Sequence, residues 1–104
     1  MTDKLAKVNK MIRILWNEKV IAESRNCIKV EGNYYFPPAD VKKEFLAASE
    51  LTTFCPWKGK AGYYSLQVDG EENRDAAWYY AEPKEEALPI KGYIAFWNVT
   101  VEEN

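Results

Sequence analysis

The chain has 104 residues, enough for one small domain with a single core. Its 14 basic and 16 acidic residues give a net charge of −2, which argues against a nucleic-acid-binding protein because such proteins usually show a clear basic excess. The sequence contains no histidine, which excludes Ser-His-Asp and Cys-His catalysis and HExxH zinc sites and leaves acid–base chemistry to lysine, tyrosine, cysteine or a carboxylate.

Strand signals begin after the N-terminal residues. Residues 1–10 lack the apolar run of a signal peptide, and we expect a flexible segment there, ahead of a single domain over residues 11–104. "MIRILW", residues 11–16, alternates large apolar residues with a polar one, which predicts a strand. Further strands with short turns between them are predicted over residues 20–24, 27–31 and 34–36. This half of the chain is typical of a β meander.

The two prolines of "YYFPPADV" end the meander, because neither can donate a hydrogen bond to a strand ladder. Val41, Phe45 and Leu46 then follow at helical spacing, and a proline suits the first turn of a helix. We predict one short helix over Ala39–Ala47.

A long hairpin is predicted next. Residues 51–55 are expected to be extended, and "PWKGKAG", residues 56–62, is expected to be a loop because it contains a proline and two glycines. Strands over residues 63–68 and 75–80 flank "DGEEN", a strong hairpin-turn signal.

A charged connection leads to the final segment, residues 92–101, which is one long strand or two strands with a break at Asn98. Together these patterns predict eight or nine short antiparallel strands with one short helix. The fold class is therefore mainly β, a single small domain built as a sandwich or as a partly open barrel.

Location and metal content follow from what the sequence lacks. No apolar run approaches the roughly 18 residues that a membrane span needs, so we expect a soluble, cytoplasmic protein. The cysteines Cys27 and Cys55 are too few for a disulfide framework and are expected to be free thiols. The acidic residues at 69–75 offer oxygen ligands for Mg²⁺ or Ca²⁺, but a solvated turn is favoured, so no metal or cofactor is predicted.

Four segments together resemble one family, the domain-of-unknown-function 427 family of small bacterial, notably cyanobacterial, and fungal proteins. The most specific segment is "TTFCPWKGKAGYYS", residues 52–65, which is similar to the family's T-x-CP-aromatic-KG-x-A-x-Y pattern. The others are "WNEKVIAES", "YYFPPADV", and "AAWYYAEP" followed by "IKGYIAFW". The match covers about Ile12 to Val101. Glu18 departs from it, because the family's first turn carries a glycine there.

The resemblance implies antiparallel strands in a twisted, coiled sheet like that of Rab-chaperone proteins, without their zinc. It implies little about activity. A nucleotidyltransferase-like label is sometimes attached to the family, but this sequence has no P-loop and no glycine–serine motif with paired aspartates. Because Lys58 lies within the motif, the resemblance also implies that this lysine has a ligand role or belongs to a structural ion pair.

Candidate functional side chains gather around the "CPWKG" loop. Cys55 lies close to Lys58 and Lys60, which lower a thiol pKa, but without histidine a buried structural thiol is favoured. Lys58 is able to anchor an anion with help from the loop amides, or to pack its stem on Trp57.

Hydroxyls and aromatic rings lie near the same loop. Trp78 and Tyr80 share one face of their strand, since they are two residues apart. If that strand pairs with the one carrying Tyr64, an aromatic wall forms around Lys58; the alternative for each ring is a place in the core. The predicted ligand-binding set is Thr53, Cys55, Trp57, Lys58, Tyr64, Trp78 and Tyr80, and the catalytic candidates are Lys58, Cys55 and Tyr64.

Two functions fit this set. The first is a small-molecule-binding protein or cofactor-free enzyme, with an aromatic-lined pocket around the "CPWKG" loop for an anionic ligand. The second is a non-catalytic interaction or scaffold module, expected as a homodimer, which meets its partner through an exposed edge and its aromatic residues. A concave pocket that encloses Lys58 would favour the first function, and an exposed aromatic patch would favour the second.

Overall fold

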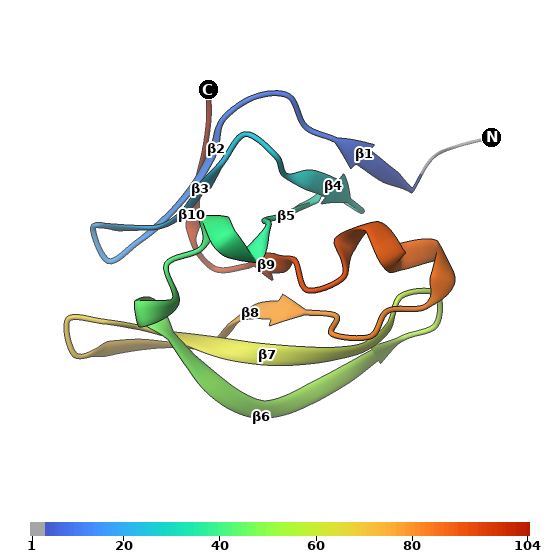
Figure 1. The fold of residues 1–104 in the computed structure, drawn as a ribbon. Coiled ribbons are helices and arrows are strands. Elements are labelled where there is room, and N and C mark those ends of the chain that lie inside the picture. The colour runs from blue at the N-terminus through green and yellow to red at the C-terminus, as the bar shows by residue number, and fades with distance from the viewer. Residues whose placement is uncertain (1–3) are drawn as a thin grey trace.

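Ten strands in three antiparallel sheets make up residues 4–104, the part of the chain that this computed structural model describes (Figure 1). One small sheet has the order β1 (Leu5–Lys7), β4 (Ile28–Val30), β5 (Asn33–Tyr35). The second small sheet has the order β10 (Thr100–Glu103), β2 (Ile12–Trp16), β3 (Lys19–Ser24). The large sheet has the order β6 (Leu46–Cys55), β7 (Gly59–Val68), β8 (Glu71–Tyr79), β9 (Ile94–Phe96). The mainly β, antiparallel prediction is confirmed, and these sheets do not close into a barrel.

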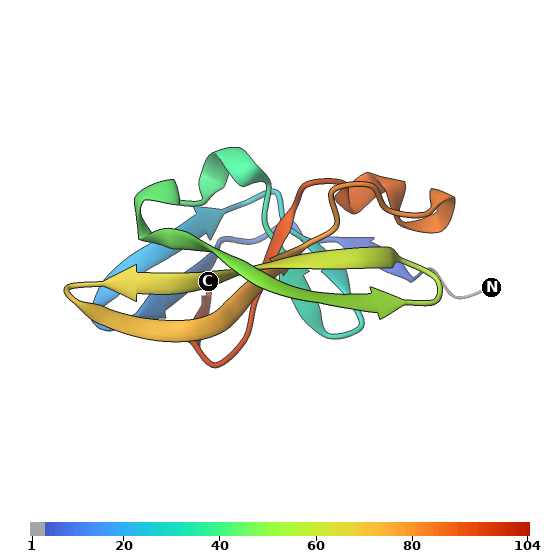
Figure 2. The ribbon, with the colours of Figure 1, turned by 90° about the horizontal axis from the view of Figure 1, so that it is seen from below.

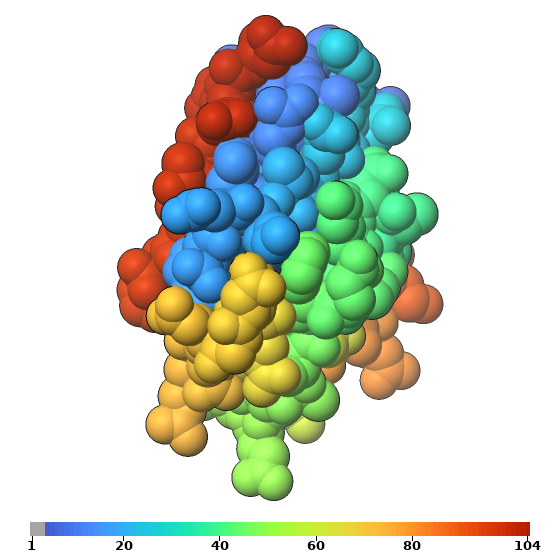
Figure 3. Space-filling model, turned by 90° about the vertical axis from the view of Figure 1, so that its left-hand side faces the viewer, coloured from blue at the N-terminus to red at the C-terminus, as the bar shows by residue number. Residues whose placement is uncertain are grey.

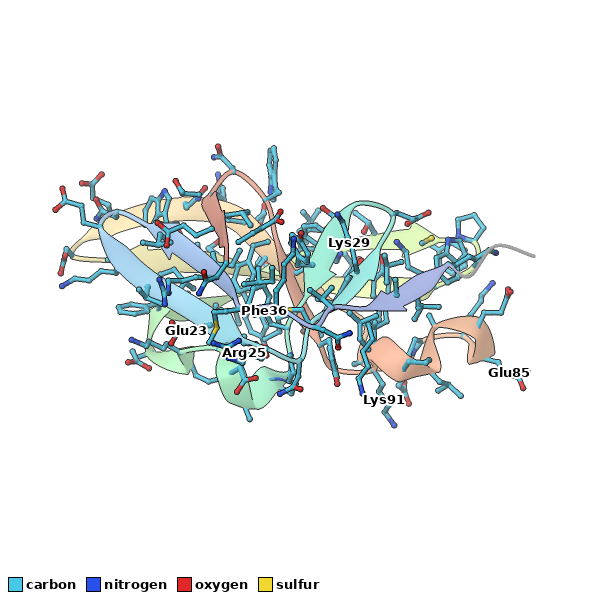
Figure 4. The ribbon with its side chains drawn as sticks, turned by 90° about the horizontal axis from the view of Figure 1, so that it is seen from above. Glu23, Arg25, Lys29, Phe36, Glu85 and Lys91 are labelled. Carbon is cyan, nitrogen blue, oxygen red and sulfur yellow. The ribbon has the colours of Figure 1, made fainter. Side chains whose placement is uncertain are left out.

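The large sheet lies below the two small sheets in the view of Figure 1. Figure 4 looks down on the small sheets, which lie side by side with Phe36 at their junction. Phe36 is fully buried, and its backbone exchanges hydrogen bonds of 2.8 and 2.9 Å with Ile94 of β9. This bridge ties the end of β5 to the large sheet.

Buried side chains form two clusters, one for each small sheet. The first cluster joins β2 and β3 to one end of β7 and includes Ile12, Ile14, Ile21, Leu66 and Val68. The second cluster joins β4 and β5 to the other end of β7 and includes Val30, Tyr35, Ala61, Tyr80 and Ile90.

The two ends of β7 bury opposite faces of the strand. Successive side chains of a strand point to opposite faces, so Ala61 lies on one face while Leu66 and Val68 lie on the other. Because both ends are buried, the large sheet has to coil along its length, in the right-handed sense that strands favour. Figure 2 shows this twist from below. The coiled sheet that the family resemblance implies is therefore present.

The tips of two hairpins meet at one end of the molecule. In Figure 3 the β2–β3 hairpin, in blue, lies against the β7–β8 hairpin, in yellow. The side-chain amide of Asn17 donates a 3.1 Å hydrogen bond to the carbonyl of Val68, which joins the two tips.

The helix predicted over Ala39–Ala47 is instead two 3-10 turns, Pro38–Asp40 and Lys43–Phe45, and its last residues already belong to β6. Val41 interrupts the helical spacing because its backbone is extended and forms a bridge with Ala22 of β3. Pairing with an existing strand therefore wins over the local helical pattern. A third 3-10 segment, Glu85–Ile90, occupies the charged connection before β9.

Part of the segment expected to be flexible, residues 1–10, forms the short strand β1. Leu5 of β1 pairs with Val30 of β4, and Val8 donates a 3.0 Å backbone hydrogen bond to Cys27. Residues 1–3 lie outside the described residues. The final segment forms two strands, β9 and β10, separated at Asn98, whose φ is +59°; the two-strand alternative is therefore the observed one.

Three hairpin turns have two central residues with positive φ, which is the type I′ pattern that matches strand twist. They are Asn17–Glu18, Glu31–Gly32 and Asp69–Gly70. Glycine adopts this conformation at no steric cost, whereas other residues strain against it by about 1–2 kcal/mol. The turn Asn17–Glu18 keeps the type I′ geometry although its second residue, with φ of +64°, is not glycine.

We predict that Glu18→Gly stabilises the protein by about 0.5–1 kcal/mol, because relief of the left-handed strain exceeds the entropy that glycine gains in the unfolded chain. Urea unfolding measures the change. Glu18→Ala is the matched control: it removes the same exposed side chain but keeps the strain, and we expect no such gain. Equal effects of the two variants would contradict the strain argument.

Candidate functional site

The "CPWKG" motif forms a tight turn between β6 and β7, shorter than the predicted loop, because Gly59 already begins β7. Gly59 has a φ of +110°, which only glycine adopts readily. Lys84 holds the turn from outside: its backbone N–H donates to the Lys58 carbonyl at 2.9 Å, and its Nζ donates to the Pro56 carbonyl at 2.6 Å. The turn is therefore held in one conformation that directs the Lys58 side chain inward.

Lys58 is buried, with 6% of its surface exposed. Its Nζ lies 2.5 Å from Oε1 of Glu31 and stands over the rings of Trp57 and Tyr80, at 5.4 and 5.5 Å from their centroids. The ammonium thus has a carboxylate on one side and ring faces on the others. We call Lys58, Glu31, Trp57, Tyr35 and Tyr80 the lysine cluster.

The charge state of this cluster follows from its contacts. Burial alone lowers the pKa of the Lys58 ammonium, but its hydrogen bond to Glu31 and the charges of its neighbours outweigh burial and raise that pKa above its ordinary value. The same hydrogen bond from Lys58 lowers the pKa of Glu31. Burial raises the pKa of Tyr80 to about 12. At neutral pH the cluster therefore contains one ion pair and a neutral phenol, and Lys58 carries its proton rather than serving as a base.

Trp78 links the lysine cluster to the outer face of the sheet. Its Nε1 donates a 3.0 Å hydrogen bond to the hydroxyl of Tyr35, and the two rings meet edge-on with centroids 6.1 Å apart. On its other side Trp78 lies 6.5 Å from the ring of Tyr63 on β7. The indole is therefore held by one polar and two aromatic contacts.

Two β-bulges flank β7 at this point. On β6 the register shifts between Ala48 and Thr52, and β8 carries extra residues opposite the stretch from Tyr64 to Leu66. The β8 bulge contains Asp75, whose φ is +54°. Bulges aim side chains away from the regular alternation of a strand, and they occur often next to functional sites.

Hydrogen bonds to Asp75 connect the two bulges. Ser49 of the β6 bulge donates to the Asp75 carboxylate, and the Asp75 N–H donates to the hydroxyl of Ser65 at 3.0 Å. The Asp75 carbonyl accepts a 2.9 Å hydrogen bond from Nε1 of Trp97. Asp75, whose backbone is strained, is thus hydrogen-bonded to β6, to β7 and to Trp97, which follows β9.

The bulges enclose an open cavity of about 440 Å³. We call it the bulge cavity; its lining residues are Leu51, Tyr63, Arg74, Asp75, Trp78 and Trp97. Trp97 is 58% exposed although its N–H is satisfied, so a large fixed ring faces the cavity. Arg74 is exposed and makes no ion pair with any residue that the structure describes. The cavity therefore offers ring faces together with an unpaired guanidinium.

A family model described as a domain of unknown function (DUF427) matches residues 4–104. The chain belongs to the DUF427 family. No curated protein matches it at a significant level. The match confirms the family that the "TTFCPWKGKAGYYS" motif suggests.

This DUF427 domain brings most of the predicted site residues together but not all of them. Trp57, Lys58 and Tyr80 meet in the lysine cluster, and Trp78 lies beside it. Cys55 is half-buried and packs against the second cluster.

Two predicted residues lie elsewhere. Tyr64 packs on the first cluster, on the opposite face of β7, where its ring stacks on Tyr79 at 4.9 Å, so it does not join an aromatic wall around Lys58. Thr53 is exposed, and its hydroxyl lies 3.1 Å from the Tyr63 hydroxyl rather than near Lys58. The catalytic candidates Lys58, Cys55 and Tyr64 therefore do not converge on one point.

The cysteines Cys27 and Cys55 of this DUF427 domain are unpaired thiols. Cys27 is fully buried, and burial raises its pKa to about 12, so it behaves as a small apolar side chain. Within residues 4–104, no group of three or more histidine, cysteine or acidic side chains is placed to hold a metal ion. Nor does that part of the chain contain a helix with the length and apolarity to cross a membrane.

Sequence reasoning missed Leu51, Tyr63, Arg74 and Trp97, and it assigned Asp75 to the tip of the hairpin. Bulges have no reliable sequence signature. A prediction that assumes unbroken alternation therefore assigns some residues of β6 and β8 to the wrong face of the sheet.

Because Glu31 has a lowered pKa and Lys58 a raised one, their pairing stabilises the fold above the unfolded-state pKa of glutamate, about 4.3, and below that of lysine, about 10.4. It is lost as the pH falls through the folded pKa of Glu31 or rises through that of Lys58. We predict that Glu31→Gln lowers Tm at pH 7 and that its difference from wild type shrinks below about pH 4.

Thermal unfolding followed by circular dichroism between pH 2.5 and pH 9 measures this difference. Glu50→Gln is the control, because the exposed Glu50 carboxylate makes no ion pair or side-chain hydrogen bond with the described residues. A difference between Glu31→Gln and wild type that stays constant over this range would rule out the ion pair as its source.

Proposed function

We propose that this DUF427 domain binds an anionic small molecule with a flat, apolar part, and that the bulge cavity is the binding site. One observation carries the proposal: an open, aromatic-lined cavity contains a guanidinium with no carboxylate partner among the described residues. Ligand sites commonly combine a concave apolar wall with a few polar groups that fix orientation.

The shape of the cavity supports a flat ligand. Trp78 and Tyr63 lie at an interplanar angle of 37°, and Trp97 adds a third ring that its hydrogen bond to Asp75 orients. Rings held by polar contacts lose little conformational freedom when a second ring packs on them. A volume of about 440 Å³ falls within the range of small-molecule sites, about 300–1,000 Å³.

The hydrogen-bond donors at the cavity support an anion. Ser49 already donates to the carboxylate of Asp75, whereas the Arg74 guanidinium has no side-chain hydrogen bond or ion pair within residues 4–104. A guanidinium binds a carboxylate through two parallel hydrogen bonds, so it selects planar anions. In this arrangement Arg74 supplies the charge that the sequence prediction assigned to Lys58, and the lysine cluster supports the site indirectly by holding Trp78 through Tyr35.

The test compares 2-naphthoate with its neutral analogue 2-naphthamide, using quenching of tryptophan fluorescence. We predict saturable binding of naphthoate that Arg74→Gln weakens about tenfold, since a hydrogen bond to a charged group contributes about 1.5 kcal/mol. Naphthamide should bind wild type and Arg74→Gln alike.

Arg25→Gln is the matched control, because Arg25 is an exposed arginine that directly follows β3. Arg25 is labelled in Figure 4. The proposal requires that this variant bind naphthoate as wild type does. Equal losses in Arg25→Gln and Arg74→Gln, or no binding of any flat anion, would overturn it.

A second candidate function is homodimerisation as a scaffold, and the free edge of β6 favours it. β6 has ten residues and one charged residue, Glu50, and among the strands of the described residues it pairs with β7 alone. Long, weakly charged edge strands are templates for pairing with another chain. Phe54, which is 66% exposed, adds an apolar contact on the same strand.

A native mass spectrum of freshly purified protein distinguishes the two candidates. The ligand proposal predicts a monomer whose naphthoate adduct is lost in Arg74→Gln. A species of twice the chain mass that Thr52→Lys on the β6 edge converts to monomer would favour the scaffold instead.

A further inference from the structure

The Glu31 carboxylate accepts hydrogen bonds from two consecutive residues of the "CPWKG" turn. Nζ of Lys58 donates to Oε1 at 2.5 Å, and Nε1 of Trp57 donates to Oε2 at 3.3 Å. Each carboxylate oxygen therefore has its own donor, one of them charged. Proteins also bind the carboxylates of ligands through charge-assisted hydrogen bonds of this kind.

The two partners of this ion pair differ strongly in exposure. The Lys58 side chain is 7% exposed, whereas the Glu31 side chain is 53% exposed. Rings of the second cluster enclose the ammonium on its inner side, so Glu31 lies on its solvent side. Removal of the Glu31 carboxylate would thus open the ammonium to solvent without disturbing the core.

Glu31 reaches the donors from a separate hairpin. It is the first central residue of the turn between β4 and β5, with a φ of +53°, where an amino acid other than glycine or asparagine is strained. The two strands of that hairpin have three residues each. The donors, by contrast, belong to a turn that Lys84 fixes from outside. The backbone that carries the donor pair is therefore held independently of Glu31.

The remaining charges around the donors are mostly positive. Nζ of Lys4 stands 4.8 Å from the centroid of the Trp57 ring, on which Lys58 also packs. The carboxylate of Glu86 lies 3.7 Å from Lys4 and is 67% exposed. Without Glu31, two ammonium groups would face one partly screened carboxylate, and the local field would attract an anion.

We infer that Trp57 and Lys58 form a binding site for a small carboxylate, and that Glu31 occupies this site as an internal ligand. A carboxylate-bearing small molecule binds by displacing the Glu31 side chain into solvent, while both donors stay in place. The site is separate from the bulge cavity, so it does not depend on the proposed function.

The experiment removes the Glu31 carboxylate by mutation and adds acetate as the probe. Glu31→Ala removes the carboxylate but keeps a β-carbon, so the backbone strain of the turn is unchanged. Thermal unfolding is measured in sodium acetate and in sodium chloride of equal ionic strength. We expect a saturable rise in Tm of the variant in acetate, roughly 5–10 °C at about ten times the acetate Kd. We expect a much smaller rise for wild type, in which Glu31 competes.

Two further variants test the donors. In the Glu31→Ala background, Lys58→Met keeps the aliphatic stem and should abolish the acetate effect. Trp57→Phe removes the indole N–H, keeps a smaller aromatic ring, and should weaken the acetate effect. If the variant with Lys58→Met does not fold, the inference is tested by comparing the acetate effect on Glu31→Ala with and without Trp57→Phe. Equal acetate effects on wild type and Glu31→Ala, no effect on either, or an unchanged effect in Trp57→Phe would overturn the inference.

Discussion

Strand β7 has to bury opposite faces at its two ends, and the architecture of the molecule depends on this constraint. Leu66 and Val68 pack on the sheet that contains β2 and β3, whereas Ala61 packs on the sheet that contains β4 and β5. A flat sheet cannot satisfy both contacts, so the large sheet coils. Gly62 lies between these regions, where a β-carbon would come within 2.6 Å of the Tyr79 ring. The close packing of that ring across β7 leaves no room for a side chain.

The position of the bulge cavity follows from the same coil. Where Tyr64 and Leu66 of β7 enter the first cluster, Tyr63 and Ser65 lie on the opposite face of the strand. The bulges of β6 and β8 fold toward that face and cover Ser65 with hydrogen-bonded groups. The exposed rings of the cavity are thus a consequence of how a small domain covers a coiled sheet, and they leave apolar surface available to a ligand.

Two of the strained backbone positions in this fold lie at the polar contacts that we connect with binding. Asp75 and Glu31 both have left-handed backbone conformations that disfavour side chains with a β-carbon, and each carboxylate is held by hydrogen bonds from another strand or turn. Surrounding contacts have to maintain such conformations. Trp78 lies between the two regions, with Tyr35 on one side and Tyr63 on the other, so a shift of its ring would affect both.

Local patterns in the sequence determined the fold class, most strand positions and the turns, because alternation and turn chemistry act over a few residues: "DGEEN" forms the expected hairpin, and "MIRILW" forms β2. The "TTFCPWKGKAGYYS" motif likewise identified the family. Only the tertiary structure decided that Val41 pairs with β3 instead of entering a helix, that Glu31 meets Lys58, and that Arg74 and Trp97 face one cavity. These outcomes depend on contacts between residues far apart in the chain and on bulges that break the strand alternation, and neither has a local signal that a sequence can carry.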